Sequence, residues 1–235
     1  MSDVPRSQRV LAKLDLAFPV FSASARRIWS SPQVRALYPM YLRTMHMVVR
    51  SAVPLMRAAL HEATDRAGSD PLCAALVDYY THHIKEETGH DGWLLDDLSA
   101  TGVNPTAVLD SIPSSKVATL VGAQYYWLHH WHPVSLLGHI TAIESYHPPA
   151  GFAEHLAQIT GYPLTAFRAI ARHAVLDVHH RRELIALLDS LPLSPQQEKM
   201  VVLSGLHTLE AGIDLLTEVA DSVAPPVDAT ITEGA

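Results

Sequence analysis

The chain has 235 residues, of which 48% are hydrophobic and 17% charged, a composition that is typical of a folded globular protein and excludes a disordered or collagen-like chain. Its formal net charge of -7 excludes the positive field with which proteins gather nucleic acids or anionic membranes. A single cysteine, Cys73, cannot form an intramolecular disulfide. We therefore expect a cytoplasmic protein with no nucleic-acid partner and no membrane partner.

Apolar residues recur at three- and four-residue intervals through nearly the whole chain, whereas the alternation of a β-strand never persists. The pattern predicts one all-α domain over residues 1–223 and a flexible tail over residues 224–235. Pro54 and Pro133 should kink or split the helices that contain them, because proline cannot donate the helical hydrogen bond. The expected helices cover residues 8–30, 32–65, 71–100, 115–147, 151–158, 163–190 and 195–222.

Histidine is unusually common here, with 15 residues against only 17 lysines and arginines. Within the expected helix 71–100, three ligand-type side chains lie within about 60° of His90 on a helical projection: His83, Glu86 and Glu87. This stripe continues the apolar positions of the same helix. We therefore expect its polar side chains to point toward the core.

Two further expected helices carry ligand-type side chains on one face. Glu144 follows Leu137 and Ile140 at helical spacing, and a carboxylate on an apolar face has to be neutralised, paired or bound to a metal. In the helix 163–190, three side chains project together: His173, Asp177 and His180. Together with one Glu-x-x-His pair from the helix 71–100, the ligand-type side chains of these two helices make a set of three imidazoles and three carboxylates.

Mixed nitrogen and oxygen ligation of this kind suits iron or manganese, and carboxylates can bridge two ions. Zinc is disfavoured, because structural zinc sites use cysteine and Cys73 lies elsewhere on the pattern. The sequence therefore predicts two iron ions, with Glu86 and His83 as rivals of Glu87 for one ligand position. The predicted ligands are Glu87, His90, Glu144, His173, Asp177 and His180.

At these motifs the chain resembles the haem-oxygenase-like diiron oxidases and oxygenases, over roughly residues 35 to 215. The resemblance implies a single-domain bundle of seven helices, two irons, and activation of dioxygen with electrons from an external donor. Its motifs are Glu87-x2-His90, Gly138-x5-Glu144 and His173-x3-Asp177-x2-His180. Members of the family also place the first glutamate at longer spacings, and His83 occupies that longer spacing here.

The resemblance further implies a small-molecule substrate from a biosynthetic pathway, such as an amino acid, an amine or a fatty acid. The implied outcomes are N-oxygenation, carbon–carbon cleavage to alkenes, and nitrile formation, and a homodimer is compatible with the fold. We expect one iron on His90, Glu144 and Glu87. The second iron would lie mainly on His173, Asp177 and His180.

Five residues are candidates for the substrate pocket, the two arginines because they could pair with a substrate carboxylate: Tyr79, Tyr126, Trp127, Arg168 and Arg172. A haem site is disfavoured, because the earliest histidine, His46, lies beyond the first expected helix. Two alternatives stay open. One is a metal-free helical module that binds a small molecule through a buried polar network, and the other is a hydrolase with a single metal ion.

Overall fold

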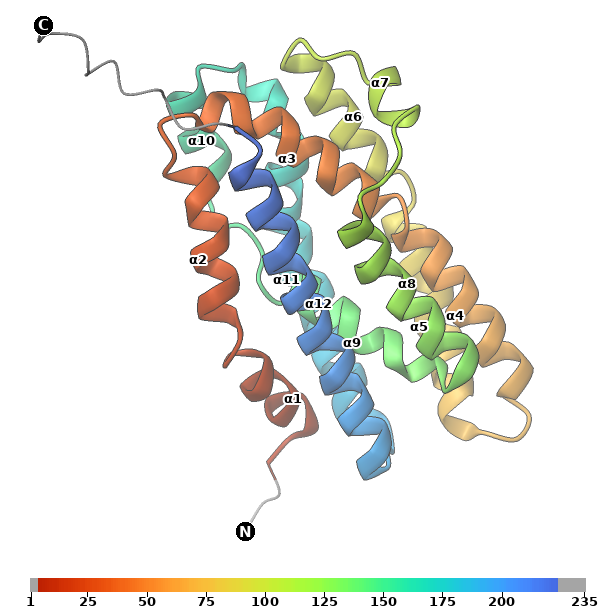
Figure 1. The fold of residues 1–235 in the computed structure, drawn as a ribbon. Coiled ribbons are helices and arrows are strands. Elements are labelled where there is room, and N and C mark those ends of the chain that lie inside the picture. Colours follow the sequence, from red (N-terminus) through yellow and green to blue (C-terminus); the bar gives the residue numbers. More distant parts are fainter. Residues whose placement is uncertain (1–3, 224–235) are drawn as a thin grey trace, which may run out of the picture.

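The computed structural model describes residues 4–223, and the regular elements among these residues are all helical (Figure 1). The predicted all-α class is therefore confirmed, whereas the expected tail over 224–235 lies outside the described residues. The elements are α1 (Arg6–Leu14), α2 (Phe18–Trp29), α3 (Val34–Val49), α4 (Ala52–Arg66), α5 (Pro71–Glu87), α6 (His90–Ala100), α7 (Thr106–Leu109), α8 (Ser115–His130), the 3-10 turn η1 (Pro133–Ser135), α9 (Leu136–Glu144), α10 (Phe152–Thr160), the 3-10 turn η2 (Leu164–Phe167), α11 (Arg168–Ser190) and α12 (Pro195–Asp221).

The predicted ranges 32–65, 71–100 and 115–147 are each subdivided at or near a proline or glycine. The range 115–147 splits at Pro133 into α8, η1 and α9, as the proline predicted. The range 32–65 splits just before Pro54, which lies in the first turn of α4, where an N–H group would have no helical acceptor.

The predicted helix over 71–100 is wrong as a single element. It breaks at Thr88 and Gly89, and Gly89 adopts a φ of 95°, a left-handed conformation that glycine tolerates better than other residues. His90 therefore begins α6 instead of continuing the helix that carries His83. The helical projection that placed these two side chains on one stripe does not apply to the folded chain.

Helix α12 is the central element of the bundle (Figure 1) and packs against α1, α2, α3, α8 and α9. It begins with a capping box: the Ser194 hydroxyl accepts from the Gln197 backbone N–H, and the Gln197 side chain accepts from the Ser194 N–H. By length and composition α12 could cross a membrane, but 56% of its most apolar window is buried inside the protein. Its apolar character is that of a core helix.

Helix α9 lies directly on α12, with almost no space between the two backbones. A Cβ atom added to Gly138 would lie 1.9 Å from the Val201 carbonyl oxygen and 2.9 Å from the Ser204 Cβ. Only glycine permits this approach. The contact fixes the position of α9 and, at its last residue, of Glu144.

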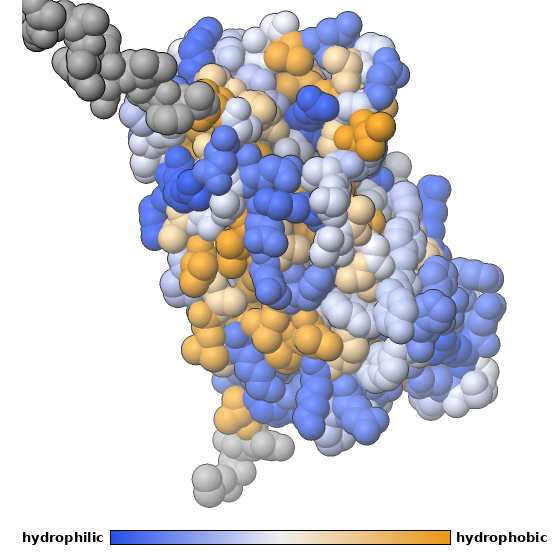
Figure 2. Space-filling model, in the orientation of Figure 1, coloured by the Kyte–Doolittle hydropathy of each residue, from blue (hydrophilic) through white to orange (hydrophobic). Residues whose placement is uncertain are grey.

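The buried apolar side chains form two main clusters. The larger cluster includes Leu55, Leu76 and Leu137, on α4, α5 and α9, and the second includes Leu94 and Phe167, on α6 and η2. Figure 2 shows an apolar area over α1, α2 and the adjoining part of α12 on the visible face. The homodimer expected from the sequence stays a prediction.

Candidate metal centre

Ligand-type side chains from four helices converge in one region of the bundle. They include all six predicted ligands and both rivals: His83, Glu86 and Glu87 on α5, His90 on α6, Glu144 on α9, and His173, Asp177 and His180 on α11. Their contacts divide them into two groups.

The first group, which we call the inner group, consists of His83, Glu144 and His180. Glu144 Oε1 lies 2.8 Å from His83 Nε2 and 3.5 Å from His180 Nδ1. All three side chains are buried. With Glu87, they offer four ligand atoms that all lie within 4.8 Å of one another.

The second group, which we call the outer group, consists of His90, His173 and Asp177. His173 Nδ1 lies 2.9 Å from Asp177 Oδ1, and the rings of His90 and His173 meet edge to face at 5.2 Å between centroids. The His173 side chain is 28% exposed, whereas His90 and Asp177 are buried, so this group reaches toward solvent through His173. Glu87 joins the groups, because Oε1 lies 3.6 Å from His180 Nδ1 and Oε2 lies 3.0 Å from His90 Nδ1.

This grouping of the side chains differs from the expected division of ligands between two ions. His180 lies with Glu144 and apart from His173, because seven residues along α11 amount to about 10 Å. His90 lies beside His173, because the break before α6 carries it away from His83. His83 contacts Glu144 directly, and Glu86 places Oε2 3.4 Å from His83 Nδ1.

The electrostatics of the inner group depend on the contact between His83 and Glu144. Burial alone would lower the pKa of His83, but the hydrogen bond and negative charge of Glu144 raise it to about 9. Burial raises the pKa of Glu144, and His83 opposes that shift. For Glu87, which lies between the two groups, burial works against ionisation, but His90 holds the pKa of this carboxyl below its usual value. The apoprotein therefore retains a proton on the inner pair at neutral pH.

The centre is a good chemical fit to a metal ion. Several buried ring nitrogens and carboxylate oxygens in it have no hydrogen-bond partner among the described residues: His83 Nδ1, Glu86 Oε2, His90 Nδ1, Glu144 Oε2 and His180 Nδ1. Their short distances to charged neighbours lack the alignment of hydrogen bonds. Buried polar groups are normally paired, so five such atoms in one place indicate a missing partner. Imidazole and carboxylate donors together suit iron.

Two contacts that the sequence analysis missed hold the outer group in place. Asp97 on α6 accepts hydrogen bonds from the backbone N–H groups of Arg168, at 3.1 Å, and Ala169, at 2.9 Å, and so caps the start of α11. Trp93 stacks on His90 with 3.9 Å between ring centroids. The signal for Asp97 was an acidic residue between the apolar positions Leu94 and Leu98.

A separate group of ligand-type atoms, Asp70, Cys73 and His132, has a structural explanation. The Val134 backbone N–H donates to His132 Nδ1, so the ring proton is on Nε2, which lies 2.9 Å from Asp70 Oδ2. A metal would need the lone pair of that same Nε2. We therefore interpret the group as a set of structural hydrogen bonds that connect the start of α5 to η1.

The candidate substrate residues lie in different places. Tyr79 lies at the centre, where its ring stacks on His83 at 5.2 Å and its buried hydroxyl has no hydrogen-bond partner in the described part of the chain. Tyr126 is 63% exposed, because α8 turns this face to solvent. Trp127 packs edge to face against His207 on α12.

The two candidate arginines point toward the surface. Arg168 lies 3.4 Å from Asp96, and both side chains are substantially exposed. The guanidinium of Arg172 lies 4.4 Å from the centroid of the Trp93 ring, a cation–π contact. Neither arginine lines the pocket beside the inner group.

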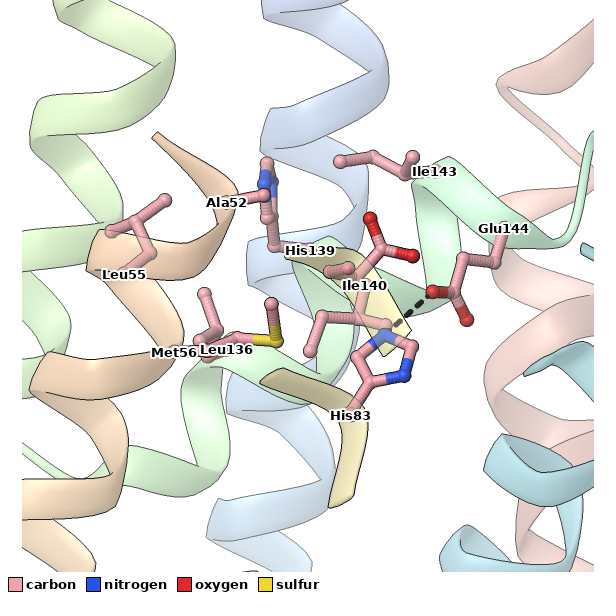
Figure 3. Close-up of a pocket in the computed structure, with 10 residues that line it drawn as sticks. Ala52, Leu55, Met56, His83, Leu136, His139, Ile140, Ile143 and Glu144 are labelled. Carbon is pink, nitrogen blue, oxygen red and sulfur yellow. Dashed lines mark ion pairs between the residues drawn. The ribbon is translucent and has the colours of Figure 1, made fainter. Parts of the chain in front are cut away.

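That pocket encloses about 360 Å³ of space, part of it open to solvent, and reaches His83, Glu87 and Glu144 (Figure 3). Its other lining residues are Ala52, Leu55, Met56, Leu136, His139, Ile140 and Ile143. The sequence does not reveal this lining, because aliphatic residues at helical spacing have the same pattern whether they fill a core or line a cavity.

The fold is similar to that of several solved structures. A domain of unknown function with a haem-oxygenase-like fold from Shewanella denitrificans has a TM-score of 0.74 and 18% identity, covering 92% of this chain and 90% of the other. A TenA homologue from Pseudomonas syringae has a TM-score of 0.68 and 15% identity, with 93% and 94% covered. A CADD-like protein of unknown function from Nostoc punctiforme has a TM-score of 0.67 and 17% identity, covering 92% of this chain and 97% of the other.

These identities support the fold and leave the activity open. No curated protein matches the sequence. The family model of iron-containing redox enzymes matches residues 40–212, a span that includes every residue of the inner and outer groups. The chain therefore belongs to the family of iron-containing redox enzymes and has their haem-oxygenase-like, all-α fold.

Proposed function

We propose that this protein is a cytoplasmic non-haem diiron oxidoreductase that uses dioxygen to oxidise a small molecule in a biosynthetic pathway. The substrate is an amino acid, an amine or a fatty acid. The product arises by N-oxygenation, by carbon–carbon cleavage or by nitrile or alkene formation, with electrons from an external donor.

One observation carries the proposal: the inner and outer groups each offer imidazole and carboxylate donors, and Glu87 contacts both groups through its two oxygens. A bridging carboxylate between two nitrogen- and oxygen-rich sites is a typical feature of diiron centres. Membership of an iron-containing family supports the same choice of metal.

In the proposed centre, His83, Glu144 and His180 would hold one iron, and His90, His173 and Asp177 would hold the other. Bound iron would supply the redox chemistry with dioxygen, which no amino-acid side chain provides. Tyr79 covers one face of the His83 ring, and the aliphatic walls of the pocket limit the access of water to the inner group. The substrate would enter through the pocket beside Glu144.

A second candidate function is hydrolysis at a single metal ion. The observation that favours it is that His83, Glu87, Glu144 and His180 alone place four ligand atoms within 4.8 Å of one another, which is enough for one ion. Such a site would use a bound divalent ion to activate water and would consume no oxygen.

Anaerobic titration of the purified apoprotein with ferrous iron, followed by exposure to oxygen in an oxygen electrode, tests the proposal. We expect two irons per chain and rapid oxygen uptake that depends on both of them. The control is His179→Ala, which removes an exposed histidine next to His180; its ion-pair partner is Glu183, and its ring centroid lies 6.4 Å from that of His180.

Binding of a single ion with no oxygen uptake would overturn the proposal and favour the hydrolase. Unchanged folding and small-molecule binding with no iron uptake would overturn both, and would make the two groups a buried polar network in a binding module.

A further inference from the structure

The pocket beside the inner group contains one polar side chain outside the candidate metal centre, His139. The remaining wall is aliphatic, and none of the lining residues is a lysine or an arginine (Figure 3). Outside the candidate metal centre, to which the protonated His83 belongs, a substrate carboxylate would therefore meet no positively charged side chain in this wall. The chemistry of His139 decides which substrate group the wall can accept.

Hydrogen bonds fix the tautomer of His139. The Thr208 Oγ1 lies 2.8 Å from the Ser204 carbonyl oxygen and 3.0 Å from His139 Nδ1. A carbonyl can only accept, so the hydroxyl proton must lie between the two oxygens, because two lone pairs would otherwise face each other at 2.8 Å. Thr208 has only one proton and can thus only accept from His139. Nδ1 therefore carries the ring proton.

The other ring nitrogen, Nε2, then has a free lone pair. No described residue donates a hydrogen bond to it, although the ring is buried and lines the pocket. Burial lowers the pKa of His139 to about 4, so the ring is neutral at physiological pH. Outside the candidate metal centre, the pocket thus presents a single fixed acceptor in an aliphatic wall.

We infer that His139 Nε2 is the polar anchor of the pocket and accepts a hydrogen bond from an O–H or N–H group of an otherwise apolar ligand. The ligand class is an apolar alcohol or amine, and a carboxylate is excluded at this position because its lone pairs would face that of Nε2. The inference rests on the proposed function in one respect, that the bound ligand is then oxidised. Ligand binding itself requires neither iron redox chemistry nor oxygen.

The first test reads the tautomer directly in the zinc-loaded full-length protein, by long-range nitrogen–proton NMR of the histidine rings. We expect a protonated Nδ1 and an unprotonated Nε2 for His139. The opposite tautomer would overturn the inference, because the pocket would then present a donor. Zinc is diamagnetic, and this measurement needs no variant.

The second test compares ligands of equal size in the same zinc-loaded protein by chemical-shift titration: cyclohexanol, cyclohexylamine, cyclohexanone and cyclohexanecarboxylate. We expect the better of the alcohol and the amine to bind at least about 10-fold more tightly than the ketone, because the ketone leaves Nε2 unpaired. Which of the two binds more tightly identifies the donor. Equal or tighter binding of the ketone or the carboxylate would overturn the inference.

The variant Thr208→Val removes the hydroxyl that fixes the tautomer, and valine has nearly the shape of threonine. The preference for alcohol over ketone should fall to within about 2-fold, because the ring can then present either a donor or an acceptor. The matched control is Thr141→Val on α9, where the buried hydroxyl bonds only to the Leu137 carbonyl. A retained preference in Thr208→Val, or an equal loss in the control, would contradict the role of Thr208.

These measurements are independent of the proposed function. If the protein consumes no oxygen with iron but discriminates alcohol from ketone, the proposed function fails and the anchor stands. If it consumes oxygen with iron and shows no discrimination, the anchor fails and the proposed function stands.

Discussion

The inner and outer groups of the candidate centre contain the same types of side chain in different surroundings. The inner group is buried, lies beside the pocket and contains a hydrogen-bonded pair at 2.8 Å, between His83 and Glu144. The outer group reaches toward solvent through His173, which is 28% exposed, and depends on Asp97 and Trp93 for its position. The inner site should therefore hold its ion tightly next to the substrate, and the outer site should exchange its ion more readily.

The largest expected effect is on metal affinity. Glu144→Ala should weaken the inner site at least about 100-fold, because it removes a ligand and leaves His83 and His180 buried without their carboxylate. His173→Ala should lose only the outer ion, together with oxygen-dependent turnover. Competition with a chromophoric chelator measures both affinities.

The control for both variants is His179→Ala, which should retain two ions. Equal losses in Glu144→Ala and His173→Ala would contradict the difference between the two sites and would mean that the ions bind as one cooperative unit.

The next effect concerns the helix that carries the inner carboxylate. Gly138→Ala should destabilise the protein by about 3 kcal/mol, because the new methyl group would overlap the Val201 carbonyl and push α9 away from α12. The inner site should weaken and the outer site should change little. Urea unfolding and metal titration measure the two effects.

Gly122→Ala on α8 is the matched control, since nothing lies within 4 Å of the added methyl group. This variant should be more stable by about 0.5–1 kcal/mol, because alanine favours a helix. Destabilisation of both variants to the same extent would show that the contact between α9 and α12 is not the cause.

The pH dependence of metal binding separates the groups further. His83 has a raised pKa of about 9, so it is protonated in the apoprotein at neutral pH, and a metal must displace that proton. The affinity of the inner site should therefore rise about 10-fold per pH unit up to about pH 9 and then level off. Zinc titration by calorimetry in buffers of different ionisation enthalpy measures the released proton.

In Glu144→Gln, the carboxylate that contributes most to the raised pKa of His83 is absent, so this pKa should be lower than in the unmodified protein. The affinity should level off at a lower pH than in the unmodified protein. An unchanged profile would mean that another group releases the proton.

The smallest expected effect concerns the support of the outer group. Asp97→Ala should cost about 1 kcal/mol of stability, because the first N–H groups of α11 lose their acceptor. Asp97→Asn keeps an acceptor oxygen and should cost less. Thermal unfolding measures both.

The same residue should also affect the pH dependence of stability. Burial raises the pKa of Asp97 to about 6, from 3.8. Its protonated form is thus favoured in the folded state, and the resulting stabilisation is complete below pH 3.8 and is lost as the pH rises through about 6. Asp97→Asn should flatten the stability profile in this range. A profile that is identical to that of the unmodified protein would contradict the raised pKa.

The positions of the ligands were predictable from the sequence to different degrees. The motif His173-x3-Asp177-x2-His180 lies within the uninterrupted helix α11, so helical spacing placed these residues on one side of it correctly. The helical projection of residues 71–100 failed for His90, which lies beyond the end of α5 at Glu87, because the left-handed conformation of Gly89 reorients the chain. A glycine in an apolar helical pattern is a weak break signal, and tertiary packing decided this case.

The sequence by itself determined the all-α class, the helix breaks at proline, and the side chains that could bind a metal, because helical periodicity and ligand chemistry are local properties. Only the tertiary structure decided that His83 joins Glu144, that His180 and His173 belong to different groups, and that aliphatic residues with His139 form the pocket. These facts depend on the packing of α11 against α6 and α9 and on the side-chain contacts of α5 with α9 and α11. Contacts between helices that are distant in the sequence have no periodicity from which they could be predicted.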